Sequence, residues 1–109
     1  MTSVPCPYLI VDTEYDGHGP VLRLRGELDV TGKDLLEDAI STAVGSRPRT
    51  LAIDLSGLAY MDCAGASVLG RTHDLLAAWP AELLVTGAQP IVARLLDLMG
   101  ARIGSLPRG

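Results

Sequence analysis

Hydrophobic and polar positions follow two different periods along the chain, and the first third has the two-residue period of strands. Residues 8–15 and 21–28 are strand-like runs joined by the sequence DGHGP, whose two glycines suit a tight reversal. In the second run, leucines alternate with Arg23, Arg25 and Glu27, so we expect one face to be buried and the other to be in water. These two runs predict an antiparallel hairpin whose sheet is covered on one side.

The rest of the chain alternates helical periods with short apolar runs. The apolar periodicity predicts helices over residues 32–45, 64–78 and 90–100. Strands are expected at 51–55 and 82–86, with a short final strand near residues 102 and 103 as a further option. Residues 51–55 are almost continuously apolar, which predicts a central, parallel strand that is buried on both faces.

The order of these elements predicts an α/β fold. Strands that alternate with helices need crossover connections, which are right-handed in nearly all proteins. We therefore expect a mixed, mostly parallel sheet of four to five strands, with the N-terminal antiparallel hairpin at one side and helices mainly on one face. The length of 109 residues fits a single domain, residues 1–109, with a core over about 8–104.

Several polar residues have local structural interpretations. Thr31 followed by Asp34 resembles a capping box at the start of the first helix. Asp54 interrupts an apolar strand, and we expect neighbouring amides or Thr50 to satisfy its carboxylate in a structural role. Ser56 and the glycine after it are typical of a turn.

The composition and charge of the chain argue against several classes of function. The net charge is −4 and charges are scattered without a basic block, so we expect no nucleic-acid binding. The apolar runs are short and no secretory signal is evident, which predicts a cytoplasmic protein without membrane insertion. Cys6 and Cys63 are expected to be reduced thiols. Because these cysteines, His18 and His73 are isolated in sequence, no metal site or cofactor is expected.

The sequence YMDCAGAS at residues 60–67 predicts the end of a buried strand, a short loop and the beginning of a helix. Asp62 can accept hydrogen bonds from the first free amides of that helix, which is the ordinary role of a helix cap. The carboxyl end of a parallel strand beside a helix amino end is also where ligands of open α/β sheets bind. The spacing of the motif alone does not decide between a cap and a docking loop.

Cys63 raises the alternative of an enzyme, because a thiol at a helix amino end can act as a nucleophile. Phosphatase-type loops resemble C-x-x-x-x-x-R, but the corresponding position is Leu69 and Arg71 comes two residues late. No base is near in sequence, since His73 lies more than two helical turns along. A small, partly buried side chain is the favoured interpretation, and we expect no enzymatic activity.

Three segments carry a resemblance to a known family. GELD at 26–29, IDLSGLAYMDCAGASVLGR at 53–71 and QPIVARLLDLMG at 89–100 together resemble an anti-sigma factor antagonist of the STAS domain family. The match spans roughly residues 20 to 100 in the right order. This resemblance implies the STAS fold and a partner-switching protein without catalysis. Such antagonists bind an anti-sigma factor, usually an ATP-bound serine kinase, and thereby free a sigma factor for transcription.

The resemblance also identifies a change at the regulatory position. In the family the loop commonly reads M-D-S-S-G or M-D-S-A-G, and the sporulation antagonists accept phosphate on the second residue after the aspartate. That position is Ala64 here, and the residue before it is Cys63. Because neither is a substrate for a serine kinase, we expect the chain to resemble a permanently unphosphorylated antagonist. Ser67 is a weak replacement phosphosite, since it lies one turn further into the helix.

By this resemblance the partner-binding positions are Glu27, Asp29, Asp62, Cys63, Ala64, Gly65 and Ser67. Glu27 and Asp29 can meet a basic partner surface, or they are solvated charges that approach the next helix cap. We expect a monomer or a weak homodimer. The alternative function is a STAS subunit or scaffold of a larger complex, such as a lipid or ion transporter or a stress assembly. Such a subunit would not need a serine that accepts phosphate.

Overall fold

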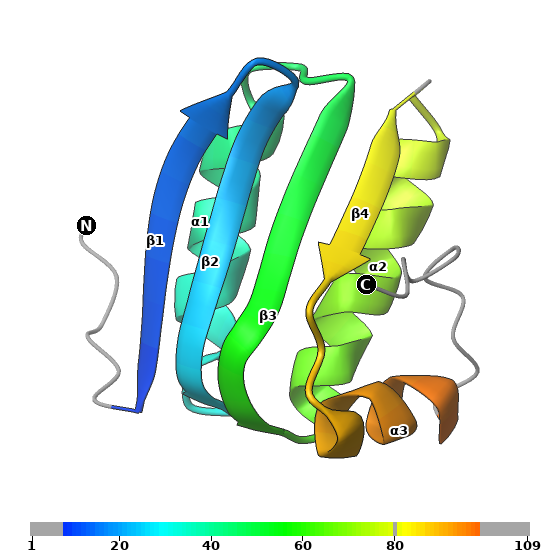
Figure 1. Ribbon diagram of the computed structural model, residues 1–109. Coiled ribbons are helices and arrows are strands. Elements are labelled where there is room, and N and C mark those ends of the chain that lie inside the picture. The colour runs from blue at the N-terminus through cyan, green and yellow to red at the C-terminus, as the bar shows by residue number, and fades with distance from the viewer. Residues whose placement is uncertain (1–7, 80, 99–109) are drawn as a thin grey trace.

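The sheet and its order of strands agree with the sequence pattern. The computed structural model describes residues 8–79 and 81–98, and within them the chain forms one sheet of four strands in the order β1-β2-β3-β4 (Figure 1). The elements are β1 (Leu9–Asp16), β2 (Gly19–Leu28), α1 (Lys33–Val44), β3 (Thr50–Met61), α2 (Cys63–Ala77), β4 (Glu82–Thr86) and α3 (Pro90–Leu98). β1 pairs with β2 antiparallel, whereas the two other pairings are parallel. The predicted mixed α/β fold with an N-terminal hairpin is confirmed.

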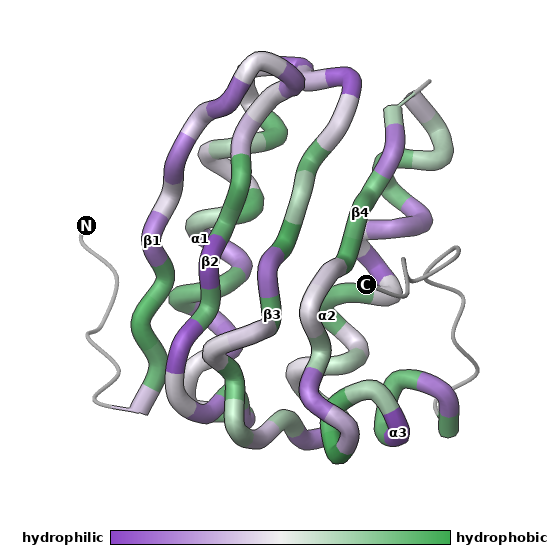
Figure 2. The backbone as a smooth tube through the Cα atoms, in the orientation of Figure 1, coloured by the Kyte–Doolittle hydropathy of each residue, from purple (hydrophilic) through white to green (hydrophobic). Residues whose placement is uncertain are grey.

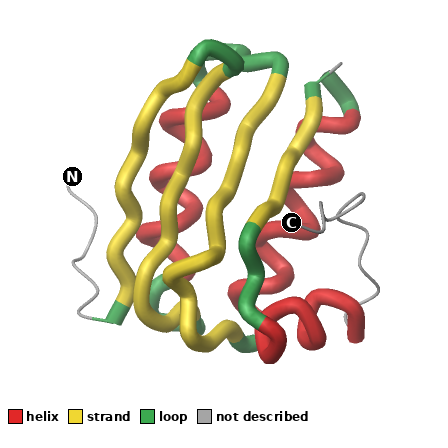
Figure 3. The backbone as a smooth tube through the Cα atoms, viewed as in Figure 1, coloured by secondary structure: helices red, strands yellow, loops and turns green. Residues whose placement is uncertain are grey.

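The helices lie on one side of this sheet. α1 and α2 run behind the strands, and α3 lies at the lower end of the sheet below β4 (Figures 1 and 3). The predicted cover of mainly one face is therefore confirmed. The further strand proposed near residues 102 and 103, the helix end at Gly100 and the thiol of Cys6 lie outside the described residues.

The core lies between the sheet and the helices, with buried residues from all four strands. Leu22, Leu24 and Leu28 of β2 are almost fully buried, as the alternation predicted. Hydrophobic and hydrophilic residues alternate along β2 in Figure 2, whereas the first half of β3 is mostly hydrophobic. In β3, Ala52 and Asp54 are only half-buried, so the prediction that this strand is buried on both faces is wrong. The reason is that the helices cover a single face, although the predicted central position and parallel pairing of the strand are confirmed.

β3 is longer than the sequence suggested and contains an irregularity where a turn was predicted. Arg23 is paired with Asp54 but Arg25 with Gly57, so β3 has one residue more than β2 between these pairs. Ser56 lies in this β-bulge, and the prediction of a turn there is wrong. Both backbone polar groups of Ser56 are hydrogen-bonded to side chains. Its N–H donates to Asp54 Oδ1 at 2.9 Å, and its carbonyl oxygen accepts from Gln89 Nε2 at 2.9 Å.

The start of α1 also differs from the prediction. The N-cap residue is Gly32, one residue after Thr31, and it makes no side-chain cap hydrogen bond itself. The prediction of Thr31 as the cap residue is therefore wrong. Thr31 instead donates its backbone N–H and its hydroxyl to Asp29 Oδ1, at 2.9 Å and 2.5 Å. These bonds form a local turn before the helix begins, and the hydroxyl is already engaged there.

The face of the sheet opposite the helices carries ion pairs. Arg23 Nη1 lies 2.6 Å from Asp54 Oδ2, and Arg23 Nε lies 3.2 Å from Glu14 Oε1. Asp54 therefore has a structural role, as predicted, and a neighbouring amide, that of Ser56, satisfies it in part. Its charged partner was not predicted. Burial raises the pKa of Asp54, but the hydrogen bonds from Ser56 and Arg23 outweigh burial and hold the pKa below its usual value.

We expect Asp54→Asn to lower the free energy of unfolding by about 1 kcal/mol at neutral pH. Because the pKa of Asp54 is lower in the folded chain, its stabilisation is present above the unfolded-state pKa and is lost as pH falls through the folded-state pKa. Urea unfolding at a series of pH values should show that the difference in the free energy of unfolding between Asp54→Asn and the wild type becomes smaller as the pH falls. Asp12→Asn removes an exposed carboxylate whose one ion pair among the described residues is with the exposed Arg25, so it should lower the free energy of unfolding by less. An unchanged acid dependence in Asp54→Asn would contradict this account.

Candidate functional site

The ends of β2 and β3 and the beginning of α2 meet at the lower edge of the sheet in Figure 1. Glu27 is paired with Tyr60, and Leu28 is paired with Met61. The N–H of Asp62 donates to the carbonyl oxygen of Leu28 at 3.1 Å, which joins the two strand ends beyond the last pair. The GELD segment and the YMDCAG segment, which are far apart in sequence, therefore form one continuous edge.

Asp62 fixes the amino end of α2. It is the N-cap residue, with extended backbone dihedral angles of φ −104° and ψ −177°. Its Oδ1 accepts a hydrogen bond from the N–H of Gly65 at 3.0 Å, and its carbonyl oxygen accepts one from the N–H of Ala66 at 3.0 Å. The predicted capping role is confirmed. The cap leaves the amides of the first two helical residues, Cys63 and Ala64, without an acceptor in the preceding turn of helix.

Gly65 allows α2 to lie close against the strand ends. It is buried, and a Cβ atom at this position would lie 2.6 Å from Leu28 Cγ and 3.2 Å from Met61 Cγ. Any larger residue would push α2 away from the sheet. Among the expected partner-binding residues, Gly65 thus positions the site by packing and offers no side chain to a partner.

The other residues of the helix amino end reach the surface. Cys63 is exposed, so the prediction of a partly buried side chain there is wrong, because the helix amino end projects from the edge of the sheet; Ala64 and Ser67 are half-buried. Sequence reasoning missed two exposed apolar side chains at the same edge of the sheet, Tyr60 with 45% of its surface exposed and Val30 with 64%. Both lie next to predicted residues, Tyr60 by its pairing with Glu27 and Val30 by following Asp29. Their sequence position next to the GELD and MD motifs is the signal that could have identified them.

The same edge carries negative charge. The hydroxyl and the backbone N–H of Thr31 donate to Asp29 and hold the pKa of its carboxyl below the usual value, so Asp29 is charged at neutral pH. This contact gives Asp29 a structural part in the turn before α1. Glu27 is exposed and forms no ion pair with any other described residue. With the half-buried Asp62, these side chains make an acidic rim around the amino end of α2.

Comparison with known proteins places this arrangement in a family. The family model of the STAS domain matches residues 10–102. The chain belongs to the STAS domain family. It is 30% identical over 98 residues to the anti-sigma-F factor antagonist RsfB of Mycobacterium tuberculosis, covering 90% of this chain and 79% of RsfB. An anti-sigma F factor antagonist of Paenibacillus polymyxa is 29% identical over 93 residues, covering 84% of this chain and 80% of the relative.

Solved structures show the same STAS fold. The crystal structure of an anti-sigma factor antagonist from Mycobacterium paratuberculosis superposes with a TM-score of 0.82 at 25% identity, covering 95% of this chain and 91% of that one. The unphosphorylated form of the antagonist SpoIIAA superposes with a TM-score of 0.68 at 26% identity, covering 84% and 81%. The fold class expected from the resemblance is thereby confirmed.

A base or a set of metal ligands near the thiol of Cys63 would be needed for it to take part in catalysis. His73, the nearest histidine in sequence, lies well along α2, with Nδ1 3.4 Å from Asp74 Oδ1. Among residues 8–79 and 81–98, no group of three or more His, Cys, Asp and Glu side chains is placed to hold a metal ion. None of the helices described there is long and apolar enough to cross a membrane.

Proposed function

We propose that this STAS protein is an anti-sigma factor antagonist. It binds an anti-sigma factor of the serine-kinase type, releases a sigma factor and so regulates transcription in the cytoplasm by partner switching. RsfB and the P. polymyxa relative are both anti-sigma F factor antagonists, which supports the general role. The observation that carries the proposal is the amino end of α2, where Cys63 and Ala64 are accessible beside the acidic Glu27.

The chemistry of this edge suits a partner surface of a definite kind. Tyr60 near the end of β3 and Val30 just after β2 supply exposed apolar area on the same edge of the sheet as Cys63 and Ala64. An apolar centre with a polar rim is the usual anatomy of a protein interface. Because the rim here is acidic, the proposed partner surface is basic around a central apolar patch.

Ala64 removes the usual means of switching this contact off. SpoIIAA has been solved in both an unphosphorylated and a phosphorylated form, so that protein accepts phosphate. A phosphate at the amino end of α2 would add about −1.5 to −2 charges beside Asp62 and weaken an interface that needs this edge. Alanine has no oxygen to accept phosphate, and a kinase set for a hydroxyl gains little from the thiol of Cys63. In this proposal the chain stays competent to bind.

We predict that the wild-type chain gains no phosphate when it is incubated with its cognate kinase and ATP. Ala64→Ser should gain one phosphate, because the cap at Asp62 already holds residue 64 at the surface of the helix end. Intact-mass spectrometry reads both results directly. Ala64→Cys is the matched control, because it has similar size but lacks the hydroxyl. Phosphate on the wild-type chain at Ser67 would show that the switch lies there instead.

The function itself is tested by the partner that the tagged chain captures from cells with and without ATP. We expect an anti-sigma factor with a kinase-like ATPase domain and no stable homodimer by analytical ultracentrifugation. Capture of a transporter ATPase or of a large stress assembly would instead support the alternative, a STAS subunit of a larger complex. Because Ala64 fits either role, this experiment and not the loop sequence separates the two.

A further inference from the structure

Three exposed residues form a row at the lower edge of the sheet, beside the amino end of α2. Glu27 of β2 is paired with Tyr60 of β3, and its N–H donates to the carbonyl oxygen of Tyr8, which directly precedes β1, at 2.6 Å. The start of β1 and the ends of β2 and β3 lie together at this edge in Figure 1. Tyr8 and Tyr60 therefore flank Glu27 on its two sides. The row adjoins the proposed docking site, because Tyr60 lies two residues before the cap at Asp62.

All three side chains lie on the face of the sheet opposite the helices. The residue that follows each of them in the chain is buried, and successive residues of a strand point to opposite faces. These buried residues are Leu9, Leu28 and Met61. Tyr8 has 60% and Tyr60 has 45% of its surface exposed, and Glu27 is exposed as well. A partner that docks at this edge can therefore reach the whole row.

The row has the chemistry of a cation site. Glu27 forms no ion pair with a described residue, and Arg25, which lies two residues before it on the same face, is paired with Asp12 at 3.0 Å. An unpaired carboxylate is common at a surface, but here an aromatic ring stands on each side of it. The faces of such rings attract cations within about 6 Å of the ring centroid. A cation bound at Glu27 is one strand spacing, about 4.8 Å, to the side of each tyrosine.

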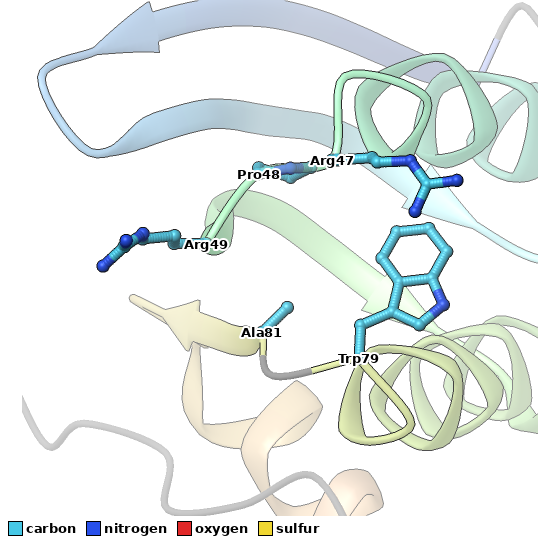
Figure 4. Close-up of a pocket in the computed structure, with 5 residues that line it drawn as sticks. All are labelled: Arg47, Pro48, Arg49, Trp79 and Ala81. Carbon is cyan, nitrogen blue, oxygen red and sulfur yellow. The ribbon is translucent and has the colours of Figure 1, made fainter.

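A guanidinium group fits this row better than an ammonium group does. It is planar, so it can lie against an aromatic ring, and its paired N–H groups donate to both oxygens of a carboxylate. A contact of this kind occurs within the protein at the opposite edge of the sheet, where the guanidinium carbon of Arg47 lies over the Trp79 ring, 5.5 Å from its centroid (Figure 4). An ammonium group is a compact, strongly hydrated charge without a flat face.

We propose that Tyr8, Glu27 and Tyr60 bind one arginine side chain of the anti-sigma factor. Glu27 accepts hydrogen bonds from the guanidinium group, and the tyrosine rings lie against that group. The inference rests on the proposed function, and it extends the docking site from Cys63 and Ala64 onto the open face of the sheet. It also specifies the basic surface expected on the partner, which must present an arginine at this face.

Calorimetry of the full chain with the ATP-bound anti-sigma factor tests the three residues. Glu27→Gln should weaken the affinity at least about tenfold, because a charge-assisted contact is lost. Tyr8→Leu and Tyr60→Leu should each weaken it by about 3- to 10-fold, because leucine is apolar but has no aromatic face. Tyr60→Phe keeps the ring and should bind nearly as the wild type does.

Matched controls lie at the opposite edge of the sheet. Tyr15, which is 63% exposed, is close to the hairpin between β1 and β2, and the exposed Glu82 begins β4. Tyr15→Leu and Glu82→Gln should both bind as the wild type does. Because all of these side chains are exposed, the melting temperature should not change. Should Tyr60→Leu lower it, Glu27→Gln and Tyr8→Leu decide the question.

A double-mutant cycle tests the nature of the partner group. It combines Glu27→Gln with replacement of each interface arginine of the anti-sigma factor by lysine. One arginine should be coupled to Glu27, because lysine keeps the charge but loses the flat face and the paired donors. Absence of coupling to every arginine would overturn the inference.

The other outcomes separate this inference from the proposed function. Wild-type affinity in Glu27→Gln, or equal losses in Tyr60→Phe and Tyr60→Leu, would overturn the arginine site. If Ala64→Asp weakens binding while the variants of the row bind as the wild type does, the inference fails and the proposed function stands. If the chain binds no anti-sigma factor, the proposed function fails and this inference fails with it.

Discussion

Ala64→Asp is expected to weaken binding of the anti-sigma factor by about 2–3 kcal/mol, which is about 30- to 150-fold in affinity. The new carboxylate would stand at the centre of the docking edge, where residue 64 is half-buried and adjacent to the cap at Asp62. A partner would have to desolvate this charge without a matching cation at that point. Folding should not suffer, because a negative charge is favourable at the amino end of a helix.

The affinity of the purified pair, measured by calorimetry, checks this prediction. Ala64→Asn is the matched control, since asparagine has the size of aspartate without its charge, and it should lose clearly less affinity. An equal loss in both variants would show that size at residue 64 matters and charge does not. Wild-type affinity of Ala64→Asp would mean that the partner does not contact this edge.

Gly65→Ala and Gly70→Ala are expected to change the stability in opposite directions although both lie in α2. At Gly65 the added Cβ would lie 2.6 Å from Leu28 Cγ, a fully buried atom with little room to move, so we expect a loss of about 1–3 kcal/mol in the free energy of unfolding. At Gly70 no described atom lies within 4 Å of an added Cβ, and alanine should stabilise the helix by about 0.5–1 kcal/mol.

Urea unfolding of the two variants gives both values under one set of conditions. Because Gly70 serves as the internal control for the general effect of alanine in a helix, the difference between the variants isolates the packing of α2 on the strand ends. A stabilisation by Gly65→Ala would contradict the close approach described here. Reduced partner binding by Gly65→Ala at a temperature where it remains folded would further show that this packing positions the docking edge.

The parts of the fold that depend on local periodicity could be predicted from the sequence. The alternation of leucine and charge around Arg23 and Arg25 defined the buried face of β2, and the glycines of DGHGP defined the hairpin. The errors arose where a local motif competed with another contact, either a side-chain hydrogen bond or pairing in the sheet. Thr31 looked like a helix cap but bonds to Asp29, and Ser56 looked like a turn but lies in a bulge of β3.

The candidate site could be predicted only in part, for a physical reason. The cap at Asp62 follows from short-range spacing, and the structure confirms it. The neighbourhood of Glu27 and Tyr60 depends on the register of two parallel strands, which hydrophobic periodicity does not determine. Likewise, Arg47 follows α1 and Trp79 follows α2, so the position of the Arg47 guanidinium 5.5 Å from the centroid of the Trp79 ring could not be predicted from a short motif.

Amide hydrogen exchange of the free chain and of its complex with the ATP-bound anti-sigma factor tests the central claim most directly. The amides of Cys63 and Ala64 lack acceptors in a preceding helical turn and should exchange rapidly in the free chain. In the complex we expect slower exchange at these two amides and in the segment from Glu27 to Val30. Unchanged exchange in both segments, with protection confined to α3 or to the open face of the sheet, would show that the partner binds elsewhere.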